Sequence, residues 1–325
     1  MSGEHFLVTG AHGCIGTWVV RELVREGVAV TALDIGDEPR RWRLVMSADE
    51  IADVRRVHAD ITDLDQVARV LDAAGITHVV HLAALQVPFC RADPPLGARV
   101  NVLGTVNIFE AVKARADRIR SIVYASSIAA YDAIEGGGGA AEMAGLPGTL
   151  YGVYKRANEG TAHVYWADHR VASVGLRPHT VFGPGRDQGL TSSPTTAMLA
   201  AAAGRPYRIP FGGRSQFQYA PDVARAFVAA ARADAVGASV HNLAGSSLEM
   251  AEVVAAIAAA APESAGQIGF DEVLLPFPGD VDATSFHGLV GPIAETPFPA
   301  AVADAVARFR DLVERGLVDV DRVLG

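Results

Sequence analysis

The sequence predicts an α/β fold built on a doubly wound parallel sheet, with a smaller C-terminal α/β substrate-binding domain. Three observations lead to this: short apolar runs alternate with helical patterns, a glycine-rich turn follows the first run, and the rhythm changes after Pro178. The chain has 325 residues, of which 50% are hydrophobic and 20% charged. This composition provides ample material for a core and excludes a disordered or fibrous chain.

The first half of the chain reads as alternating buried strands and amphipathic helices. The predicted strands cover residues 6–8, 28–33, 54–57, 78–82, 122–125 and 171–176. The predicted helices cover residues 15–26, 63–74, 100–113 and 151–168. Such alternation implies right-handed βαβ units and a sheet with helices on both faces, as in a Rossmann fold. Residues 134–148 are rich in Gly and Ala and predict a mobile loop before the last of these helices.

The second half has a different pattern of elements. Residues 191–196 are rich in Ser and Thr and lead into an Ala-rich helix. Further elements are expected as strands near 217–219 and at 240–243, and as helices from 222, at 248–260 and at 300–315. We therefore predict a dinucleotide-binding Rossmann domain at 1–178, completed by about 216–245, and a smaller substrate-binding domain at 179–325.

The turn after the first strand has the spacing of a phosphate-binding loop. Its glycines, Gly10, Gly13 and Gly16, stand three residues apart. Glycine permits the tight turn and the close approach of the backbone to a diphosphate. Cys14 and Ile15 then open the next helix, whose N–H groups and positive end attract an anion. The strand–turn–helix context predicts a dinucleotide site.

The end of the second strand indicates which dinucleotide binds. Asp34 lies 18 residues beyond Gly16, where a carboxylate accepts both ribose hydroxyls of the adenosine half and repels a 2′-phosphate. The predicted cofactor is therefore NAD rather than NADP. Arg40 and Arg41 follow in a loop and are interpreted as solvated surface.

The end of the third strand carries another acid. Asp60 and Ile61 lie there, and the Asp60 carboxylate suits the adenine amino group. The alternative is that Asp60 caps the helix that follows, a role that Thr62 or Asp63 fits equally well.

A tyrosine and a lysine share one face of the helix predicted at 151–168. Tyr151 and Lys155 are four residues apart, and Ser126 and Ser127 end the fifth strand. A tyrosine hydroxyl titrates near pH 10 in isolation, and a neighbouring ammonium together with a nicotinamide ring would lower that pKa toward working pH. Ser127 is then expected to hold the substrate oxygen against Tyr151.

These motifs together resemble the extended short-chain dehydrogenase/reductases, the NAD-dependent epimerase/dehydratase family. The resemblance runs over most of the chain and is carried by residues 9–16, 81–84, 101–105, 124–131, 151–155 and 176–185. It implies that Leu82, Ala83, Ala84, Asn101 and Pro178 contact the cofactor together with Tyr151 and Lys155. Register from Tyr131 implies that Ser127, rather than Ser126, is the catalytic hydroxyl.

The resemblance also implies a mechanism and an assembly. Tyr151 removes a proton from a substrate hydroxyl while hydride leaves the same carbon for the nicotinamide. Lys155 holds the ribose and lowers the Tyr151 pKa. Members of the family often form homodimers through the helix bearing the Asn101 motif and the helix bearing Tyr151, and we expect a homodimer here.

Two departures from the family pattern bear on the reaction. Residues 128–129 are Ile-Ala, where dehydratases carry an Asp-Glu pair, so the acid and base for eliminating water are missing. Nucleotide-sugar members carry Arg-Asp-Phe where this chain has residues 215–217, Ser-Gln-Phe. Ser215 stands at the position of the diphosphate-binding arginine, and Arg214 is one residue early. This pattern favours a small polar substrate.

Three functions remain open at this point. The first is an NAD-dependent oxidoreductase that oxidises a secondary hydroxyl of a small sugar, sugar acid or similar polyhydroxylated compound. The alternative is an NAD-dependent (nucleotide-)sugar epimerase, and the third is a non-catalytic dinucleotide-binding protein. The candidate substrate contacts are Gln86, Phe89, Cys90, Arg91, Ser127, Thr180, Arg186 and Arg214. Among them, Arg91 or Arg214 would bind a carboxylate.

Composition and spacing argue against other partners. The net charge is −9 and no basic cluster occurs, which disfavours nucleic acid and anionic membranes. Two cysteines build no disulfide framework, the start lacks a signal-peptide pattern, and no apolar run approaches the roughly 20 residues that span a bilayer, so a cytoplasmic location is expected. His12 and His179 lack metal-ligand spacing, and no metal is predicted.

Overall fold

The computed structural model describes residues 3–131 and 146–324. Seven parallel strands form its central sheet in the order β10-β6-β5-β4-β1-β2-β3. These strands are β1 (His5–Thr9), β2 (Ala29–Asp34), β3 (Arg55–His58), β4 (His78–His81), β5 (Ser121–Ala125), β6 (Ala172–Arg177) and β10 (Ala238–Asn242). The strand order reverses between β1 and β4, which is the doubly wound arrangement. The predicted fold class is confirmed.

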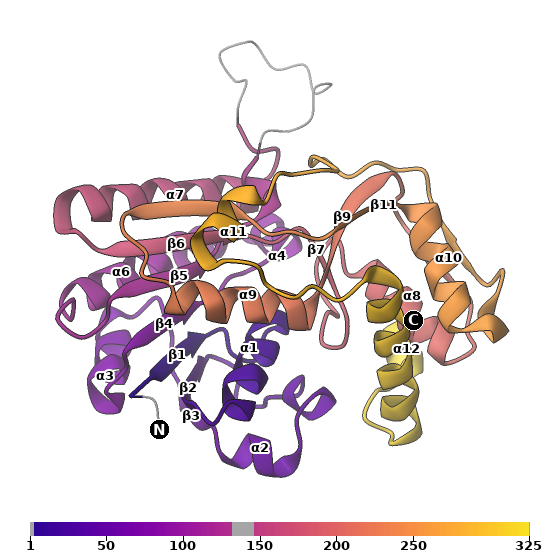
Figure 1. The fold of residues 1–325 in the computed structure, drawn as a ribbon, viewed down its shortest axis with the longest axis horizontal. Helices are drawn as coiled ribbons and strands as arrows, with labels where there is room; N and C mark the ends of the chain where they lie inside the picture. Colours follow the sequence, from indigo (N-terminus) through magenta and orange to yellow (C-terminus); the bar gives the residue numbers. More distant parts are fainter. Residues whose placement is uncertain (1–2, 132–145, 325) are drawn as a thin grey trace.

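Helices cover both faces of this sheet (Figure 1). They are α1 (Cys14–Arg25), α2 (Ala48–Ala52), α3 (Leu64–Ala74), α4 (Val87–Ala92), α5 (Pro94–Ala98), α6 (Gly104–Lys113), α7 (Leu150–His169) and α9 (Ala220–Arg232). Alternating side chains of β1 explain the two layers, because successive residues of a strand point to opposite faces. Phe6 and Val8 pack with Phe227 of α9, whereas Leu7 packs with Phe109 of α6. Both faces are therefore apolar, as a buried parallel sheet requires.

A second core lies beyond the main sheet. Its elements are β7 (Thr180–Phe182), α8 (Ser193–Ala202), β8 (Tyr207–Ile209), β9 (Arg214–Tyr219), β11 (Ser246–Glu249), α10 (Met250–Ala260), β12 (Ile268–Phe270), α11 (Thr284–Val290), α12 (Phe298–Glu314) and α13 (Val320–Leu324). The strands form two small sheets, β11-β9-β7 and β12-β8. In Figure 1, α8, α10 and α12 stand together on the side of the molecule away from α3 and α6.

Several predicted bounds differ from the structure. The helix predicted at 248–260 begins at Met250, because residues 246–249 pair with β9 as an edge strand. The helix predicted at 100–113 opens with a π-helical turn at Arg99–Leu103 before α6 begins. After β6 the chain leaves the main sheet, and it returns with α9 and β10. The division into two domains at residue 178 stays a prediction, and residues 134–145 of the predicted mobile loop lie outside the described residues.

Candidate active site

The glycine loop between β1 and α1 leaves no room for side chains where it turns. Gly10 has φ +65°, and a Cβ atom there would lie 2.6 Å from the backbone nitrogen of Ala83. A Cβ atom on Gly16 would lie 2.3 Å from the carbonyl oxygen of Gly10. Helix α1 begins at Cys14 with no capping side chain at Gly13, so its first N–H groups are available to an anion. The loop and the positive helix end therefore fit a dinucleotide diphosphate.

Asp34 is held at the end of β2 by two backbone groups. Its carboxylate accepts hydrogen bonds from the N–H of His12 at 2.8 Å and from the N–H of Gly36 at 2.9 Å. These bonds tie the carboxylate to the glycine loop and orient it in the wall of the cavity that the loop borders. The position fits an acceptor for the hydroxyls of an adenosine ribose.

A cavity of about 1250 Å³ runs from the glycine loop past Tyr151 to the second core. The predicted cofactor residues in its wall are Gly10, Gly13, Cys14, Ile15, Gly16, Asp34, Asp60, Ile61, Leu82, Ala83, Ala84, Tyr151, Lys155 and Pro178. Asn101 is not among the lining residues. Its side chain is buried and exchanges two hydrogen bonds with the backbone of Leu85, at 2.7 and 2.8 Å. Asn101 thus shapes the loop after β4 from behind.

The residue that caps α3 distinguishes between the two roles considered for Asp60, adenine binding and helix capping. Asp63 is the residue that caps this helix, since its carboxylate accepts the N–H of Gln66 at 3.0 Å. Asp60 instead accepts the N–H of Thr62 at 2.8 Å and lines the cavity. Its placement suits the adenine contact and leaves the capping role to Asp63.

Three side chains meet where α7 passes the end of β5. The Ser127 hydroxyl lies close enough to Tyr151 to lower the pKa of the tyrosine hydroxyl, and the Lys155 ammonium lies 5.5 Å from the centre of the Tyr151 ring. The Lys155 ammonium also donates to the carbonyl oxygen of Ala125 at 2.6 Å. A Cβ atom on Gly152 would lie 2.1 Å from a backbone oxygen of the turn after Ser127. Glycine at this position lets α7 approach closely enough for Tyr151 to reach Ser127.

Burial is the largest influence on the pKa values of Tyr151 and Lys155. It raises the pKa of Tyr151 above the usual 10, while the Ser127 hydrogen bond and the charge of Arg186 lower it. Burial also lowers the pKa of Lys155 to about 8. The sequence predicted a Tyr151 pKa below its usual value, and the polypeptide by itself does the opposite because desolvation outweighs the favourable contacts.

The two serines after β5 have different surroundings. Ser126 donates to the buried carboxylate of Glu159 at 2.5 Å. Arg177 donates to both oxygens of Glu159, at 2.7 and 2.6 Å, and this charge-assisted pair holds the pKa of Arg177 above its usual value. Ser127 faces Tyr151 and lines the cavity. The catalytic role of Ser127, rather than Ser126, stays a prediction that this placement allows.

Arg186 lies in the cavity wall, where its charge acts on both Cys14 and Tyr151. Arg186 donates to the hydroxyl of Thr191 at 3.1 Å, and its Nε is buried without a hydrogen-bond partner among the described residues. The Oε1 atom of Gln86 is likewise buried without a partner there. Both residues and His179 line the cavity, and burial lowers the pKa of His179. The guanidinium and amide therefore have hydrogen-bonding capacity left for a ligand.

The remaining candidate substrate residues lie outside the cavity wall. Phe89 and Arg91 are exposed on α4, and Cys90 is buried with its pKa raised by burial. Thr180 is buried and bonds the hydroxyl of Ser215 at 2.8 Å. Arg214 points away from the cavity and pairs with Glu249 of β11 at 3.1 Å. A substrate role for these residues stays a prediction without support from their placement.

The sequence assigned no site role to many residues of the cavity wall, among them His12, Arg41 and His179. Arg41 is not the solvated surface residue that was expected: it pairs with Asp187, 146 positions later, and is only 21% exposed. No local pattern signals such a pair. His12 follows the second residue of the glycine loop, and its place in that motif was the available signal.

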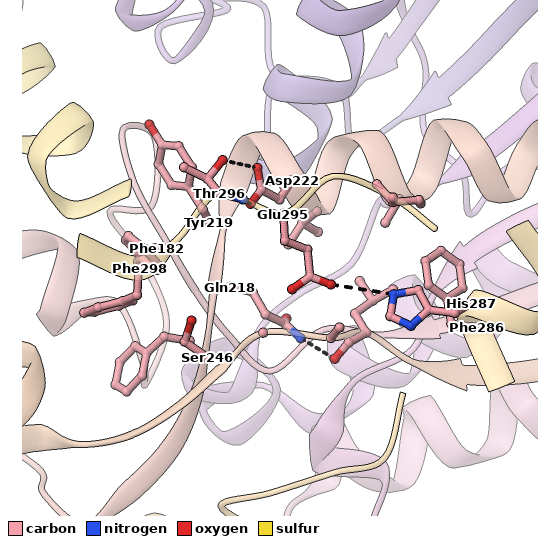
Figure 2. Close-up of a pocket in the computed structure, with 17 residues that line it drawn as sticks. Phe182, Gln218, Tyr219, Asp222, Ser246, Phe286, His287, Glu295, Thr296 and Phe298 are labelled. Atoms are coloured by element: carbon pink, nitrogen blue, oxygen red, sulfur yellow. Dashed lines mark hydrogen bonds and ion pairs between the residues drawn. The ribbon is translucent and has the colours of Figure 1, made fainter. Parts of the chain in front are cut away.

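A second hollow of about 40 Å³ lies between α9 and the segment after α11. Figure 2 shows Glu295 reaching toward Nε2 of His287, 3.6 Å away, and Thr296 bonded to Asp222. The volume holds about three water molecules at most, too little for a substrate.

The described residues contain neither a metal-binding cluster nor a membrane-spanning helix. In residues 3–131 and 146–324, no three His, Cys, Asp or Glu side chains gather where they would hold a metal ion. Across the same ranges, no helix has both the length and the apolar character needed to cross a bilayer.

Sequence comparison adds relatives to this geometry. The sequence model of the NAD dependent epimerase/dehydratase family matches residues 6–244. UDP-glucuronate 4-epimerase 5 of Arabidopsis thaliana is 34% identical over 187 residues, 56% of this chain and 43% of that protein. UDP-glucose 4-epimerase of Mycolicibacterium smegmatis is 33% identical over 240 residues, 69% of this chain and 72% of that protein. The match thus spans less than half the length of the plant relative.

Solved structures resemble the whole chain. UDP-glucose 4-epimerase of Thermus thermophilus, solved with NAD, superposes with a TM-score of 0.74 at 26% identity, covering 94% of this chain and 99% of that one. A partial consensus L-threonine 3-dehydrogenase superposes with a TM-score of 0.80 at 25% identity, over 94% and 99% of the two chains.

Proposed function

The chain belongs to the NAD dependent epimerase/dehydratase family, and from that premise we propose that it is an NAD-dependent 4-epimerase of sugars carried on UDP. Membership in this family makes NAD the cofactor. The sequence alone favoured a dehydrogenase of a small polyhydroxylated compound over an epimerase. The relatives favour the epimerase alternative, because the plant and bacterial proteins that match this chain carry that activity in their names.

One observation carries the proposal. Ser127, Tyr151 and Lys155 lie in the wall of the same cavity as Gly10 and Asp34, so a cofactor held by the glycine loop reaches the catalytic side chains. At about 1250 Å³ the cavity exceeds the roughly 300–1,000 Å³ of a pocket for one drug-sized ligand. That size supports joint occupation by a dinucleotide and a nucleotide sugar.

Proton transfer in this proposal depends on Tyr151. Its hydroxyl, as the anion, takes the proton of the substrate hydroxyl and later returns it to the same oxygen. Ser127 holds that oxygen next to Tyr151, and the Lys155 ammonium, fixed by the carbonyl of Ala125 and 5.5 Å from the centre of the Tyr151 ring, would favour the tyrosinate by its charge. Bound NAD supplies the acceptor and then the donor of hydride at that carbon. The glycine loop would hold its diphosphate and Asp34 its adenosine ribose.

The proposal includes an acidic group on the sugar. Arg186 makes no ion pair among the described residues, its Nε atom is buried without a partner, and its charge acts on Tyr151. The buried Oε1 atom of Gln86 accepts from a hydroxyl or an N–H, and it lies close to Gly189, as does the guanidinium of Arg186. A uronate has both a carboxylate for an arginine and hydroxyls for an amide. The unpaired groups of Arg186 and Gln86 therefore support UDP-glucuronate over UDP-glucose as the substrate.

A second candidate has an observation of its own. Ser215 stands at the position of the diphosphate-binding arginine, and its hydroxyl is buried against Thr180. Arg214 is committed to Glu249 on the outside of the sheet. This favours an NAD-dependent dehydrogenase of a small hydroxy compound, in line with the similarity to the consensus L-threonine 3-dehydrogenase.

Product analysis in D₂O separates the two candidates. The purified protein is incubated with UDP-glucuronic acid or UDP-glucose, without added NAD, and the products are followed by NMR. The epimerase proposal expects the 4-epimer with no deuterium at C4 and no accumulation of NADH. In a parallel incubation with added NAD, NADH formed in step with substrate oxidation, without any 4-epimer, would overturn it in favour of the dehydrogenase.

A matched pair of variants on α7 controls this experiment. Tyr151→Phe removes the proposed acid and base and should abolish turnover. Tyr154→Phe removes a hydroxyl from the same helix that bonds the carbonyl oxygen of Pro94 outside the cavity, and it should retain turnover. Equal activity of the two variants would remove Tyr151 from the mechanism.

We also propose a homodimer. Apolar side chains are exposed near the start of α6 and along α7, with Leu103 45%, Val153 42% and Val164 53% exposed. Burial of such surface stabilises association. Light scattering of the purified protein should give twice the mass of 34.0 kDa, and a monomeric mass at micromolar concentration would exclude this assembly. A cytoplasmic location stays a prediction.

A further inference from the structure

Two loops that are distant in sequence meet beside the glycine loop. Arg41 follows β2 and Asp187 follows β7, and they are 146 positions apart. The guanidinium of Arg41 donates to one oxygen of Asp187 from Nε at 3.0 Å and from Nη2 at 2.6 Å. Its Nη1 donates to the carbonyl oxygen of His12 at 2.9 Å. One side chain thus ties a segment of the second half of the chain to the phosphate-binding turn.

The segment that carries Asp187 is anchored at its other end as well. The indole N–H of Trp18 in α1 donates to the carbonyl oxygen of Pro184 at 2.9 Å, in a buried bond. Gly183 and Gly185 flank this proline with φ +119° and +93°, a region that L side chains rarely adopt. The segment is therefore shaped by two glycines and held by Trp18 and by Arg41.

These residues border the groove where the dinucleotide diphosphate would lie. Arg41, Gly185 and Asp187 line the same cavity as Gly13 and Cys14. Burial raises the pKa of the Cys14 thiol to about 11, the charges of Arg186 and Arg41 oppose this rise, and the charge of Asp187 adds to it. Arg41 and Asp187 are thus close enough to act on the first residue of α1, where a diphosphate would bind.

We propose that Arg41 and Asp187 form a latch that closes the cofactor groove beside the glycine loop and retains bound NAD between turnovers. The inference rests on the NAD binding in the proposed function, and it deepens that function. A 4-epimerase returns hydride to the same sugar and gains from a cofactor that stays bound, whereas a dehydrogenase must release NADH in every cycle.

The opposite charges of Arg41 and Asp187 explain how a carboxylate can stand beside a site for a diphosphate. An isolated Asp187 beside a diphosphate would repel it, and its removal would then strengthen cofactor binding. Paired with Arg41, the carboxylate is neutralised and connects the two loops. A latch therefore predicts that removing either partner speeds release, whereas a simple cationic role of Arg41 predicts opposite effects of the two removals.

The test measures the release of NADH directly. Wild type, Arg41→Ala, Asp187→Asn and the double variant are loaded with NADH, and the loss of its protein-enhanced fluorescence is followed after a chase with excess NAD. We expect each single variant to release NADH about 2- to 5-fold faster, the scale of one partly exposed ion pair. The double variant should release it no faster than Arg41→Ala, because both changes open one latch. NAD retained through purification, measured by chromatography of an acid extract, should fall in parallel.

A matched control removes an ion pair elsewhere. Arg208 pairs with Asp271 on the surface of the β12-β8 sheet, away from the cavity, so Arg208→Ala should release NADH as wild type does. Slower release from Asp187→Asn, or unchanged release from both single variants, would overturn the latch. Wild type that binds NADH but forms no 4-epimer would end the epimerase proposal alone, whereas wild type that binds no NADH would overturn both proposals.

Discussion

The hydroxyl of Ser126 donates to the carboxylate of Glu159 at 2.5 Å, behind the strand end whose next residue faces the cavity. Glu159 comes from α7, one helical turn after Lys155, and Arg177 of β6 binds it from the other side. This buried network joins α7 to β5 and β6. It thereby fixes the distance between the element that carries Ser127 and the helix that carries Lys155.

The two adjacent serines should respond differently to the same substitution. Ser127→Ala removes the hydroxyl that faces Tyr151 and lowers its pKa, and we expect kcat to fall about 10²- to 10³-fold, as when one oriented donor is lost. Ser126→Ala should keep most of kcat and lower the free energy of unfolding by about 1–3 kcal/mol, since it removes a donor from a buried carboxylate. Steady-state kinetics and urea unfolding of both variants check this. A larger loss of kcat in Ser126→Ala would reverse the assignment.

The affinity for NAD should depend on pH through Lys155. Burial lowers the pKa of this side chain from 10.5 to about 8, so the free protein loses the ammonium as the pH rises through about 8. If the ammonium binds the cofactor, the Kd for NAD should rise above that pH by at most about tenfold per unit. Calorimetric titrations from pH 6.5 to 9.5 measure this. Lys155→Met should bind NAD weakly with a Kd that no longer follows this titration, and a wild-type pH dependence in that variant would contradict the role.

The same shift has a consequence for stability with the opposite pH trend. Because the folded-state pKa of Lys155 is about 8 and the ordinary value is 10.5, the unfolded chain binds more protons between these two values. The contribution of Lys155 to the free energy of unfolding therefore increases as the pH rises through this window. Urea unfolding of wild type and Lys155→Met at pH 7.5 and 9.5 measures this contribution. The free energy of unfolding should gain from this pH increase in wild type, and that gain should be absent from the variant.

Replacement of Asp34 should change the choice of cofactor. The carboxylate is oriented by the N–H groups of His12 and Gly36, and its charge repels a 2′-phosphate. Asp34→Asn should weaken NAD about tenfold and reduce the discrimination against NADP, since a neutral amide keeps only part of the acceptor capacity. Calorimetry with both dinucleotides measures the ratio. Asp37→Asn, at a carboxylate 87% exposed three residues later, is the matched control, and an equal change in both variants would remove Asp34 from recognition.

Asp222 should matter for stability. Its carboxylate accepts the N–H and the hydroxyl of Thr296 at 2.7 and 2.9 Å, which fastens the segment after α11 to α9 over the small hollow in Figure 2. Asp222→Ala should lower the free energy of unfolding by about 1–3 kcal/mol because it leaves these donors unpaired. Asp234→Ala, at an acid 93% exposed, should change it by less than about 0.5 kcal/mol. Urea unfolding midpoints of the three proteins test this prediction. Equal midpoints for wild type and Asp222→Ala would refute the stabilising role of Asp222.

Local sequence patterns were sufficient to predict those parts of the site whose geometry is set by one helix, one strand or one turn. The Gly10–Gly16 spacing determines the shape of a single turn, and a separation of four residues puts Tyr151 and Lys155 on one helical face whatever surrounds them. Asp34 follows from its position at a strand end. These parts of the site were predictable because their distances arise within a few residues of chain.

Contacts between distant segments required the tertiary structure. Arg214 became a substrate candidate because it stands one residue before the position of the diphosphate-binding arginine, whereas in the structure it pairs with Glu249 of the neighbouring strand β11. Arg41 was interpreted as surface, yet the path of the chain through β7 brings Asp187 to it. The sequence led us to expect that neighbouring charges lower the pKa of Tyr151. In the folded polypeptide burial raises it, since desolvation depends on every neighbour that excludes water.

The sequence by itself determined the alternation of strands and helices, the phosphate-binding turn and the face shared by Tyr151 and Lys155, because backbone geometry repeats over a few residues. Only the tertiary structure decided which arginines face the cavity and which pair elsewhere. Packing brings together side chains up to 146 positions apart, and no local pattern records which of them will meet.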